Sequence, residues 1–191
     1  LPGFDFAPHY IELGGRRMHY LDEGPRGGET ILCLHGEPSW CYLYRQMIPL
    51  LAERHRVIAP DFFGFGRSDK YPNRDDYTFQ MHFDSLVDLL ERLDLRRLTL
   101  VCQDWGGLIG LPVAMHHPER FSRLVIMNTW QPGLSWQGHV DQLLQLVPGS
   151  KGPAKVATSQ TPIEDLAAYI PRTILSPFST NNIIGVVLLA L

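Results

Sequence analysis

Residues 101–107 read Val-Cys-Gln-Asp-Trp-Gly-Gly and stand between an apolar, β-like run and a helical run. A small residue two positions before the centre and a glycine pair after it form the layout of a nucleophile elbow, a turn with little room for neighbouring side chains. The following helix stabilises negative charge at its N-terminus. Asp104 at the centre is therefore predicted to be a nucleophile. The alternative is an Asp that only caps the helix, but the glycine pair and the preceding strand favour the elbow.

Short apolar runs alternate with helical runs through the first 129 residues. Strands are predicted at residues 10–13, 18–21, 30–34, 56–59, 98–102 and 124–127. Helices are predicted at 39–51, capped by Ser39, at 78–93, with Phe79, Phe83, Leu86 and Leu90 on one face, and at 107–116. Because several strands are apolar on both faces, the pattern predicts an α/β fold with a mostly parallel sheet between layers of helices.

The composition changes after residue 129. Pro, Gly, Ser and Gln become frequent, and residues 161–164, Thr-Pro-Ile-Glu, form a capping box that predicts a helix through Tyr169. We therefore expect a core at 1–129, a partial helical cap at 130–180 and an apolar tail at 181–191. The tail is shorter than the about 20 residues of a membrane-spanning helix. We interpret it as the start of a missing part or as sequence foreign to the fold.

The charge and cysteine content exclude several classes of function. Lys and Arg number 17 against 20 Asp and Glu, and the net charge of -3 offers no basic stripe for nucleic acid and no polybasic patch for a membrane. Cys33, Cys41 and Cys102 have neither zinc-site spacing nor the density of a disulfide scaffold, so we interpret them as buried side chains. No metal or cofactor is expected. The N-terminus lacks the pattern of a signal peptide, which favours a cytoplasmic setting.

Residues 59–69 read Ala-Pro-Asp-Phe-Phe-Gly-Phe-Gly-Arg-Ser-Asp and contain two closely spaced glycines after a strand. The third glycine of a dinucleotide-binding G-x-G-x-x-G motif falls on Asp69, so that motif fails. Ser68 is not the centre of a G-x-S-x-G elbow, because Lys70 follows two positions later. We interpret this segment as a structural turn.

Four segments together resemble the haloalkane dehalogenases, which have the α/β-hydrolase fold. They are His-Gly-Glu-Pro-Ser-Trp at 35–40, Asp-Phe-Phe-Gly-Phe-Gly-Arg-Ser-Asp-Lys at 61–70, Asp-Tyr-Thr-Phe at 76–79 and Gln-Asp-Trp-Gly-Gly at 103–107. Their order and spacing match, and the resemblance covers the first 129 residues closely and the expected cap loosely. Each segment alone is shared with epoxide hydrolases.

The resemblance implies a role for each matching residue. The Asp104 carboxylate displaces halide from a small halogenated alkane and forms an alkyl ester, which water then hydrolyses to an alcohol. The backbone N–H groups of Glu37 and Trp105 form the oxyanion hole. The Trp105 indole binds the halide, and the cap provides the second halide donor, for which Trp136 is our candidate and Trp130 the substitute. The side chain of His35 is interpreted as a hydrogen-bonded turn residue.

The residues that hydrolyse the ester are not found in the sequence. In this fold the acid and then the base histidine follow the nucleophile, with the histidine near the C-terminus. The final histidine here is His139, inside the expected cap, and His116 and His117 are interpreted as helix-end residues. We therefore assign no catalytic histidine or acid, expect the last strands to be missing, and expect alkylation without turnover.

Two alternatives stay open. An epoxide hydrolase uses the same Asp nucleophile but protonates its leaving group with cap tyrosines, and Tyr169 is the only Tyr after Tyr77. Gln103 also favours the dehalogenase, because epoxide hydrolases more often have His before the nucleophile. The second alternative is a truncated, inactive homologue that acts as a binding or structural remnant.

Overall fold

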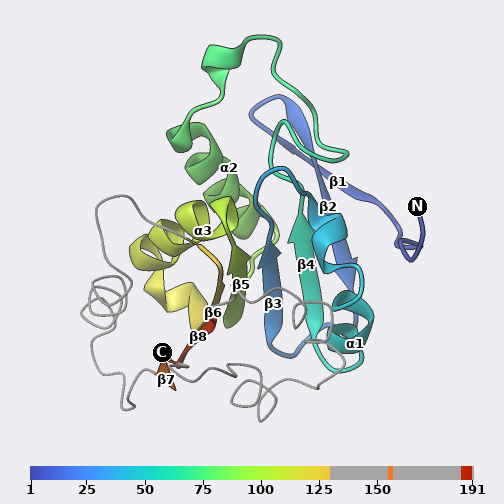
Figure 1. Ribbon diagram of the computed structural model, residues 1–191, viewed down its shortest axis with the longest axis vertical. Helices are drawn as coiled ribbons and strands as arrows, with labels where there is room; N and C mark the ends of the chain where they lie inside the picture. Colours follow the sequence, from blue (N-terminus) through green and yellow to red (C-terminus); the bar gives the residue numbers. More distant parts are fainter. Residues whose placement is uncertain (130–154, 157–185, 191) are drawn as a thin grey trace.

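The computed structural model describes residues 1–129, 155–156 and 186–190. In this part of the chain the strands form one sheet in the order β1-β2-β4-β3-β5-β6-β8-β7 (Figure 1). The strands are β1 (His9–Leu13), β2 (Arg16–Glu23), β3 (Thr30–Leu34), β4 (Arg56–Pro60), β5 (Leu98–Gln103), β6 (Phe121–Met127), β7 (Lys155–Val156) and β8 (Val186–Ala190). β4, β3, β5 and β6 pair in parallel, and every other pairing is antiparallel. The predicted mostly parallel α/β sheet is confirmed.

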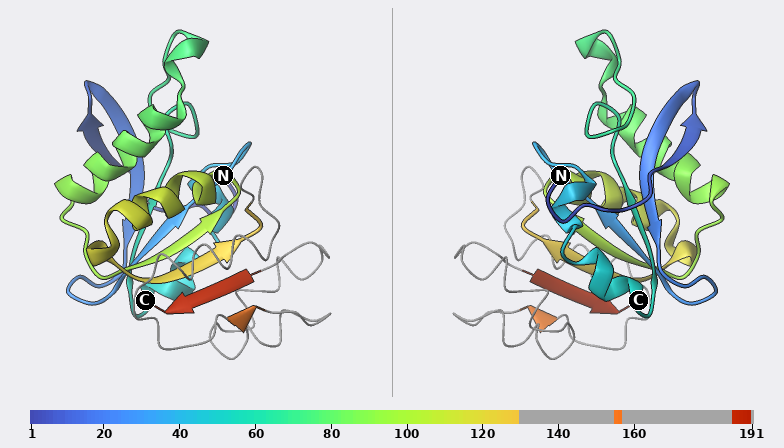
Figure 2. Two further views of the ribbon diagram at one scale, coloured as in Figure 1. Left: turned by 90° about the vertical axis from the view of Figure 1, so that its left-hand side faces the viewer. Right: turned by 90° about the vertical axis from the view of Figure 1, so that its right-hand side faces the viewer.

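The helices lie on both sides of this sheet. They are α1 (Ile48–Ala52), α2 (Phe79–Arg92) and α3 (Trp105–His116), with 3-10 turns η1 (Cys41–Tyr44), η2 (Arg74–Asp76) and η3 (Pro118–Arg120). Figure 2 shows α2 and α3 on one face and α1 on the other. Alternate side chains of the inner strands supply both cores, since Leu32 and Leu34 of β3 join the core beneath α2 and α3, whereas Ile31 and Cys33 join the core beneath α1. This alternation explains why the inner strands are apolar throughout.

The helix predicted at residues 39–51 is wrong. The chain forms η1 and the short α1 instead, and the Ser39 hydroxyl donates to the neighbouring Trp40 carbonyl rather than capping a helix. Pro49 accounts for the interruption, because proline has no N–H to continue a helix and is tolerated in the first turn, where it lies in α1.

The helix predicted at residues 78–93 is confirmed as α2, with one correction to its buried face. The Thr78 hydroxyl caps it by accepting a hydrogen bond from the Met81 N–H at 3.1 Å. Leu86 and Leu90 are buried as expected. Phe79 is exposed, because it lies in the first turn and packs beside Phe83 near the surface instead of entering the core.

The predicted cap and tail are only partly within the described residues. Residues 186–190 of the apolar tail form β8, which pairs with β6 and covers an edge that would otherwise be open. The capping box at 161–164 and Tyr169 lie outside the described residues. None of the helices in the described part is long and apolar enough to cross a bilayer. All three cysteines are free and buried, as predicted.

Candidate active site

Asp104 lies on the sharp turn between β5 and α3. Its backbone has φ 53° and ψ -122°, a conformation that costs a non-glycine residue about 1–3 kcal/mol. Hydrogen bonds on both sides hold this turn: the Asp104 N–H donates to the Asn128 carbonyl at 3.1 Å, and the Asp104 carbonyl accepts the Gly107 N–H at 2.9 Å. Asp104 therefore lies on a sharp, strained turn between a strand and a helix.

The two glycines after Asp104 allow three strand ends to meet at the turn. A Cβ on Gly106 would overlap the Leu34 carbonyl at the end of β3, and a Cβ on Gly107 would overlap the side chain of Thr129 after β6. Parallel strands end at the same edge of a sheet, so these neighbours follow from the β3-β5-β6 order (Figure 1). Glycine is required at both positions because the Leu34 backbone and the Thr129 side chain leave no room for a Cβ atom.

Asn128 and Thr129 are supporting residues that the sequence analysis missed. Thr129 donates its hydroxyl to the Asp104 carbonyl at 2.6 Å, and Asn128 accepts from the Asp104 N–H. Asn128 itself has a positive φ of 38°. The sequence places both residues directly after a predicted strand. That position alone does not indicate that they bind the backbone of Asp104.

The loop after β3 brings a backbone N–H to the Asp104 side chain. The Glu37 N–H donates to Oδ1 of Asp104 at 2.9 Å, while the Glu37 side chain itself is exposed. Gly36 has no room for a side chain, because a Cβ there would overlap the Asp104 carboxylate. The backbone of this loop is therefore in direct contact with the Asp104 side chain.

The tryptophans near the elbow differ in their surroundings. Trp105 begins α3 and is 43% exposed, although it directly follows Asp104. Among the described residues, the backbone N–H of Trp105 makes no hydrogen bond to the Asp104 carboxylate. Of the two backbone amides predicted for the oxyanion hole, Glu37 therefore supplies the one that contacts this carboxylate. Trp40 stacks on Tyr42 at a centroid separation of 5.6 Å and packs against Phe4, which identifies it as a packing residue. The predicted cap residues Trp130 and Trp136 lie outside the described residues.

His35 is a buried turn histidine, as predicted. Its Nδ1 lies 3.0 Å from the Gly36 carbonyl oxygen, and its Nε2 accepts a hydrogen bond from the Phe62 N–H at 3.0 Å. Burial lowers the pKa of His35, against smaller opposing effects of the Gly36 carbonyl and of Asp61. Within the described part of the chain, no histidine hydrogen-bonds to Asp104.

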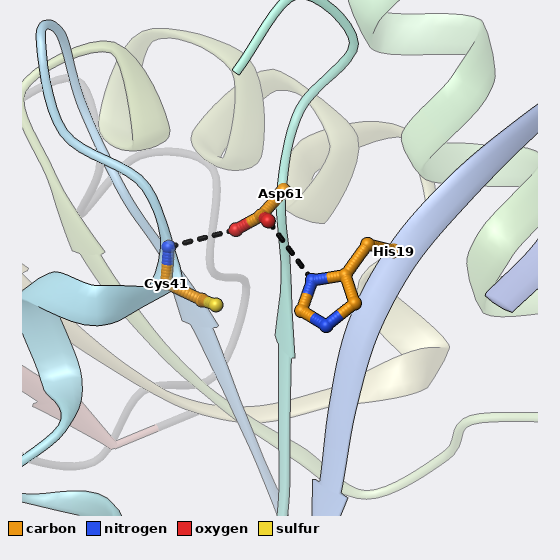
Figure 3. Close-up of side chains that lie close together, drawn as sticks. All are labelled: His19, Cys41 and Asp61. Carbon is orange, nitrogen blue, oxygen red and sulfur yellow. Dashed lines mark hydrogen bonds and ion pairs between the residues drawn. The ribbon is translucent and has the colours of Figure 1, made fainter. Parts of the chain in front are cut away.

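The segment at residues 59–69 is the structural turn that we expected, and its centre is the buried Asp61. Figure 3 shows the Asp61 carboxylate between His19 and Cys41. Its oxygens accept hydrogen bonds from the Cys41 N–H at 2.8 Å, from His19 Nδ1 at 2.9 Å and from the Arg67 N–H at 2.8 Å. Burial alone would raise the pKa of Asp61, but these donors more than offset it and lower the pKa.

His19, Cys41 and Asp61 lie close enough together to be considered as metal ligands. Their chemistry does not fit a cation, since His19 Nδ1 carries the proton that it donates to the carboxylate. Burial and the Asp61 charge raise the pKa of the Cys41 thiol, which disfavours the thiolate that binds metals. We interpret the three residues as a structural cluster in which Asp61, directly after β4, links His19 of β2 to Cys41 at the start of η1.

Several known proteins are similar to this chain in sequence and in fold. A family model described as alpha/beta hydrolase fold matches residues 29–164. A haloalkane dehalogenase of Psychrobacter cryohalolentis is 56% identical over 138 residues, which cover 69% of this chain and 46% of that protein. The chain therefore spans less than half the length of this curated relative.

Two solved structures extend the comparison. The tetrameric haloalkane dehalogenase DpaA from Paraglaciecola agarilytica is 39% identical with a TM-score of 0.67, over 95% of this chain and 64% of that chain. An epoxide hydrolase from metagenomes of hot environments is 30% identical with a TM-score of 0.64, over 69% of this chain and 45% of that chain. From the family match and the observed sheet, the chain belongs to the α/β-hydrolase fold family.

Proposed function

We propose that this chain carries the nucleophile half of a haloalkane dehalogenase, with Asp104 as the attacking residue. The observation that carries the proposal is the Asp104 carboxylate on its strained turn, with Oδ1 held by the Glu37 N–H at 2.9 Å. A carboxylate is ionised at neutral pH and needs no base to attack, which suits Asp at an elbow where serine would need one. The 56% identity to a haloalkane dehalogenase supports the same substrate class.

The proposed reaction begins when an Asp104 oxygen attacks the sp3 carbon of a halogenated alkane. A carbon–oxygen bond forms as the carbon–halogen bond breaks, and the halide leaves with the bonding electron pair. The Trp105 indole N–H is a donor on an apolar ring and suits the departing halide, with Trp136 or Trp130 as the second donor. The amides of Glu37 and Trp105 are the proposed oxyanion hole for ester hydrolysis.

Hydrolysis of the ester needs a base to activate water and an acid to orient that base. Within the described residues, no histidine is hydrogen-bonded to the Asp104 carboxylate, and we assign neither the base nor the acid. His35 is excluded as the base, because both of its ring nitrogens are engaged by backbone groups. A cytoplasmic setting is part of the same proposal.

An epoxide hydrolase is the second candidate, favoured by the structural similarity to a metagenomic epoxide hydrolase. The two reactions leave different products on the same residue, because a bromoalkane leaves an alkyl ester and an epoxide a hydroxyalkyl ester. We would incubate the chain with matched pairs of short bromoalkanes and epoxides, measure intact mass, and locate each adduct by peptide mapping. Alkyl adducts formed faster than hydroxyalkyl adducts support the dehalogenase.

The reverse order would favour the epoxide hydrolase. A folded sample that forms neither adduct would favour an inactive remnant over both enzymes. Folding is checked independently by amide protection in β5 and α3, so that an unfolded sample is not mistaken for an inactive one.

A further inference from the structure

The peptide unit between Gly36 and Glu37 contacts two functional groups at opposite ends. Its N–H, contributed by Glu37, donates to Oδ1 of Asp104 at 2.9 Å. Its carbonyl oxygen, contributed by Gly36, lies 3.0 Å from Nδ1 of His35 and also accepts a hydrogen bond from the Ser39 N–H at 2.9 Å. Because a peptide is planar and its N–H and C=O point in opposite directions, a bond that fixes the carbonyl also fixes the direction of the N–H.

The Phe62 backbone determines which ring nitrogen of His35 carries the proton. The Phe62 N–H donates to Nε2 at 3.0 Å, so Nε2 has a free lone pair and is unprotonated. The neutral ring then carries its proton on Nδ1, which donates to the Gly36 carbonyl. Burial of the ring, which is 1% exposed, favours this neutral form.

We propose that His35 is a positioning residue, which aligns the Gly36–Glu37 peptide so that the Glu37 N–H points at Oδ1 of Asp104. The chain of contacts runs from the Phe62 N–H through the imidazole to the Gly36 carbonyl, and from the same peptide to the nucleophile. It connects the loop after β4 to the loop after β3, and the latter contacts Asp104. His35 does not touch the reacting atoms, so its effect is indirect.

The consequence for chemistry rests on the proposed function of Asp104. When water or hydroxide attacks the alkyl ester, the carbonyl oxygen of the ester gains negative charge, and a preoriented N–H stabilises that charge. The same N–H is less useful in ester formation, because the carboxylate loses charge in that step. His35 therefore affects hydrolysis of the ester more strongly than its formation.

Two amide substitutions separate the two hydrogen bonds of His35. In His35→Asn, the amide nitrogen takes the place of Nδ1 and keeps a donor for the Gly36 carbonyl. In His35→Gln, the amide oxygen takes the place of Nε2 and keeps an acceptor for the Phe62 N–H. Each variant loses one buried hydrogen bond, so a merely structural role would affect both alike.

The first readout is hydrogen exchange of the Glu37 backbone amide, measured by NMR on the full chain without any substrate. We expect slow exchange in the wild type and in His35→Asn, and exchange about tenfold faster in His35→Gln, as for the loss of one aligned hydrogen bond. Equal exchange in the two variants would overturn the proposal. The 15N shifts of the wild-type His35 ring give a test that needs no variant, because an unprotonated Nδ1 would also overturn it.

The second readout is the decay of the Asp104 ester to hydroxide at mildly alkaline pH, followed by intact mass. We expect decay in His35→Gln to be slower by about tenfold, less than the 10²–10³ for deleting a donor outright, and near the wild-type rate in His35→Asn. Equal decay in the two variants would contradict the proposal. If the wild type forms no ester, the proposed function fails, whereas the amide exchange still decides the role of His35.

Discussion

Substituting Gly36 by Ala tests the contact between the loop after β3 and the nucleophile. The added Cβ would lie 2.8 Å from Cγ of Asp104 and closer still to its Cβ and Oδ1, whereas ordinary contact begins at 3.4 Å. The loop and the carboxylate must therefore separate by at least 0.6 Å. A misplacement of about 1 Å at a reacting group costs on the order of 10²-fold in rate, so we expect Gly36→Ala to slow ester formation on Asp104 by about that factor.

The assay is the rate of adduct formation with a bromoalkane, followed by intact mass under single-turnover conditions. Gly28→Ala is the matched control, because a Cβ at Gly28 meets no atom within 4 Å. The overpacked variant should also lose about 1–3 kcal/mol of unfolding free energy, so folding is verified at the assay temperature. A folded Gly36→Ala chain that is alkylated at the wild-type rate would refute the inferred close approach.

Three further variants probe neighbouring contacts. Asp22 accepts two hydrogen bonds of 2.7 Å from Arg56; burial alone would raise its pKa, but the Arg56 bonds and charge lower it. Because the folded pKa lies below the unfolded one, this stabilisation is present above about pH 4 and is lost as the pH falls through the folded pKa. Asp22→Asn should therefore cost about 2 kcal/mol at pH 7 in chemical unfolding, and a difference that does not shrink in acid would contradict this. Thr129→Val removes the hydroxyl that donates to the Asp104 carbonyl and should cost about 1 kcal/mol in the same assay; Thr129→Ser should retain most of it, and equal losses would exclude the hydroxyl as the cause. Trp105→Phe removes an indole donor beside the nucleophile and should weaken bromide binding about tenfold in a fluorescence titration, whereas unchanged affinity would remove Trp105 from the halide site.

The inner sheet was predictable because burial on both faces leaves a strong pattern. The apolar residues 30–34 and 98–102 become β3 and β5 with almost the predicted bounds. The helix expected after Ser39 did not form, because Pro49 lies between the apolar residues whose spacing indicated a helix and starts the short α1 instead. A proline that starts a new helix and one that ends a helix give the same local signal.

The tight turn at Asp104 was predictable for a similar reason, since Gly106 and Gly107 mark close approaches that only glycine tolerates. The contacts that support it were not. Thr129 reaches Asp104 across 25 residues, and Phe62 reaches His35 across 27. Such bonds depend on which strands become neighbours in the sheet, and nothing in the local sequence of either partner specifies them.

The most direct test of the central claim is to count bromide release and Asp104 ester formation in the same sample. We would incubate the chain with a short bromoalkane, measure free bromide, and map the adduct in the wild type and in Asp104→Asn. We expect one bromide released for each ester on Asp104, and neither in Asp104→Asn. An adduct that maps to another residue, or that persists in folded Asp104→Asn, would show that Asp104 is not the nucleophile.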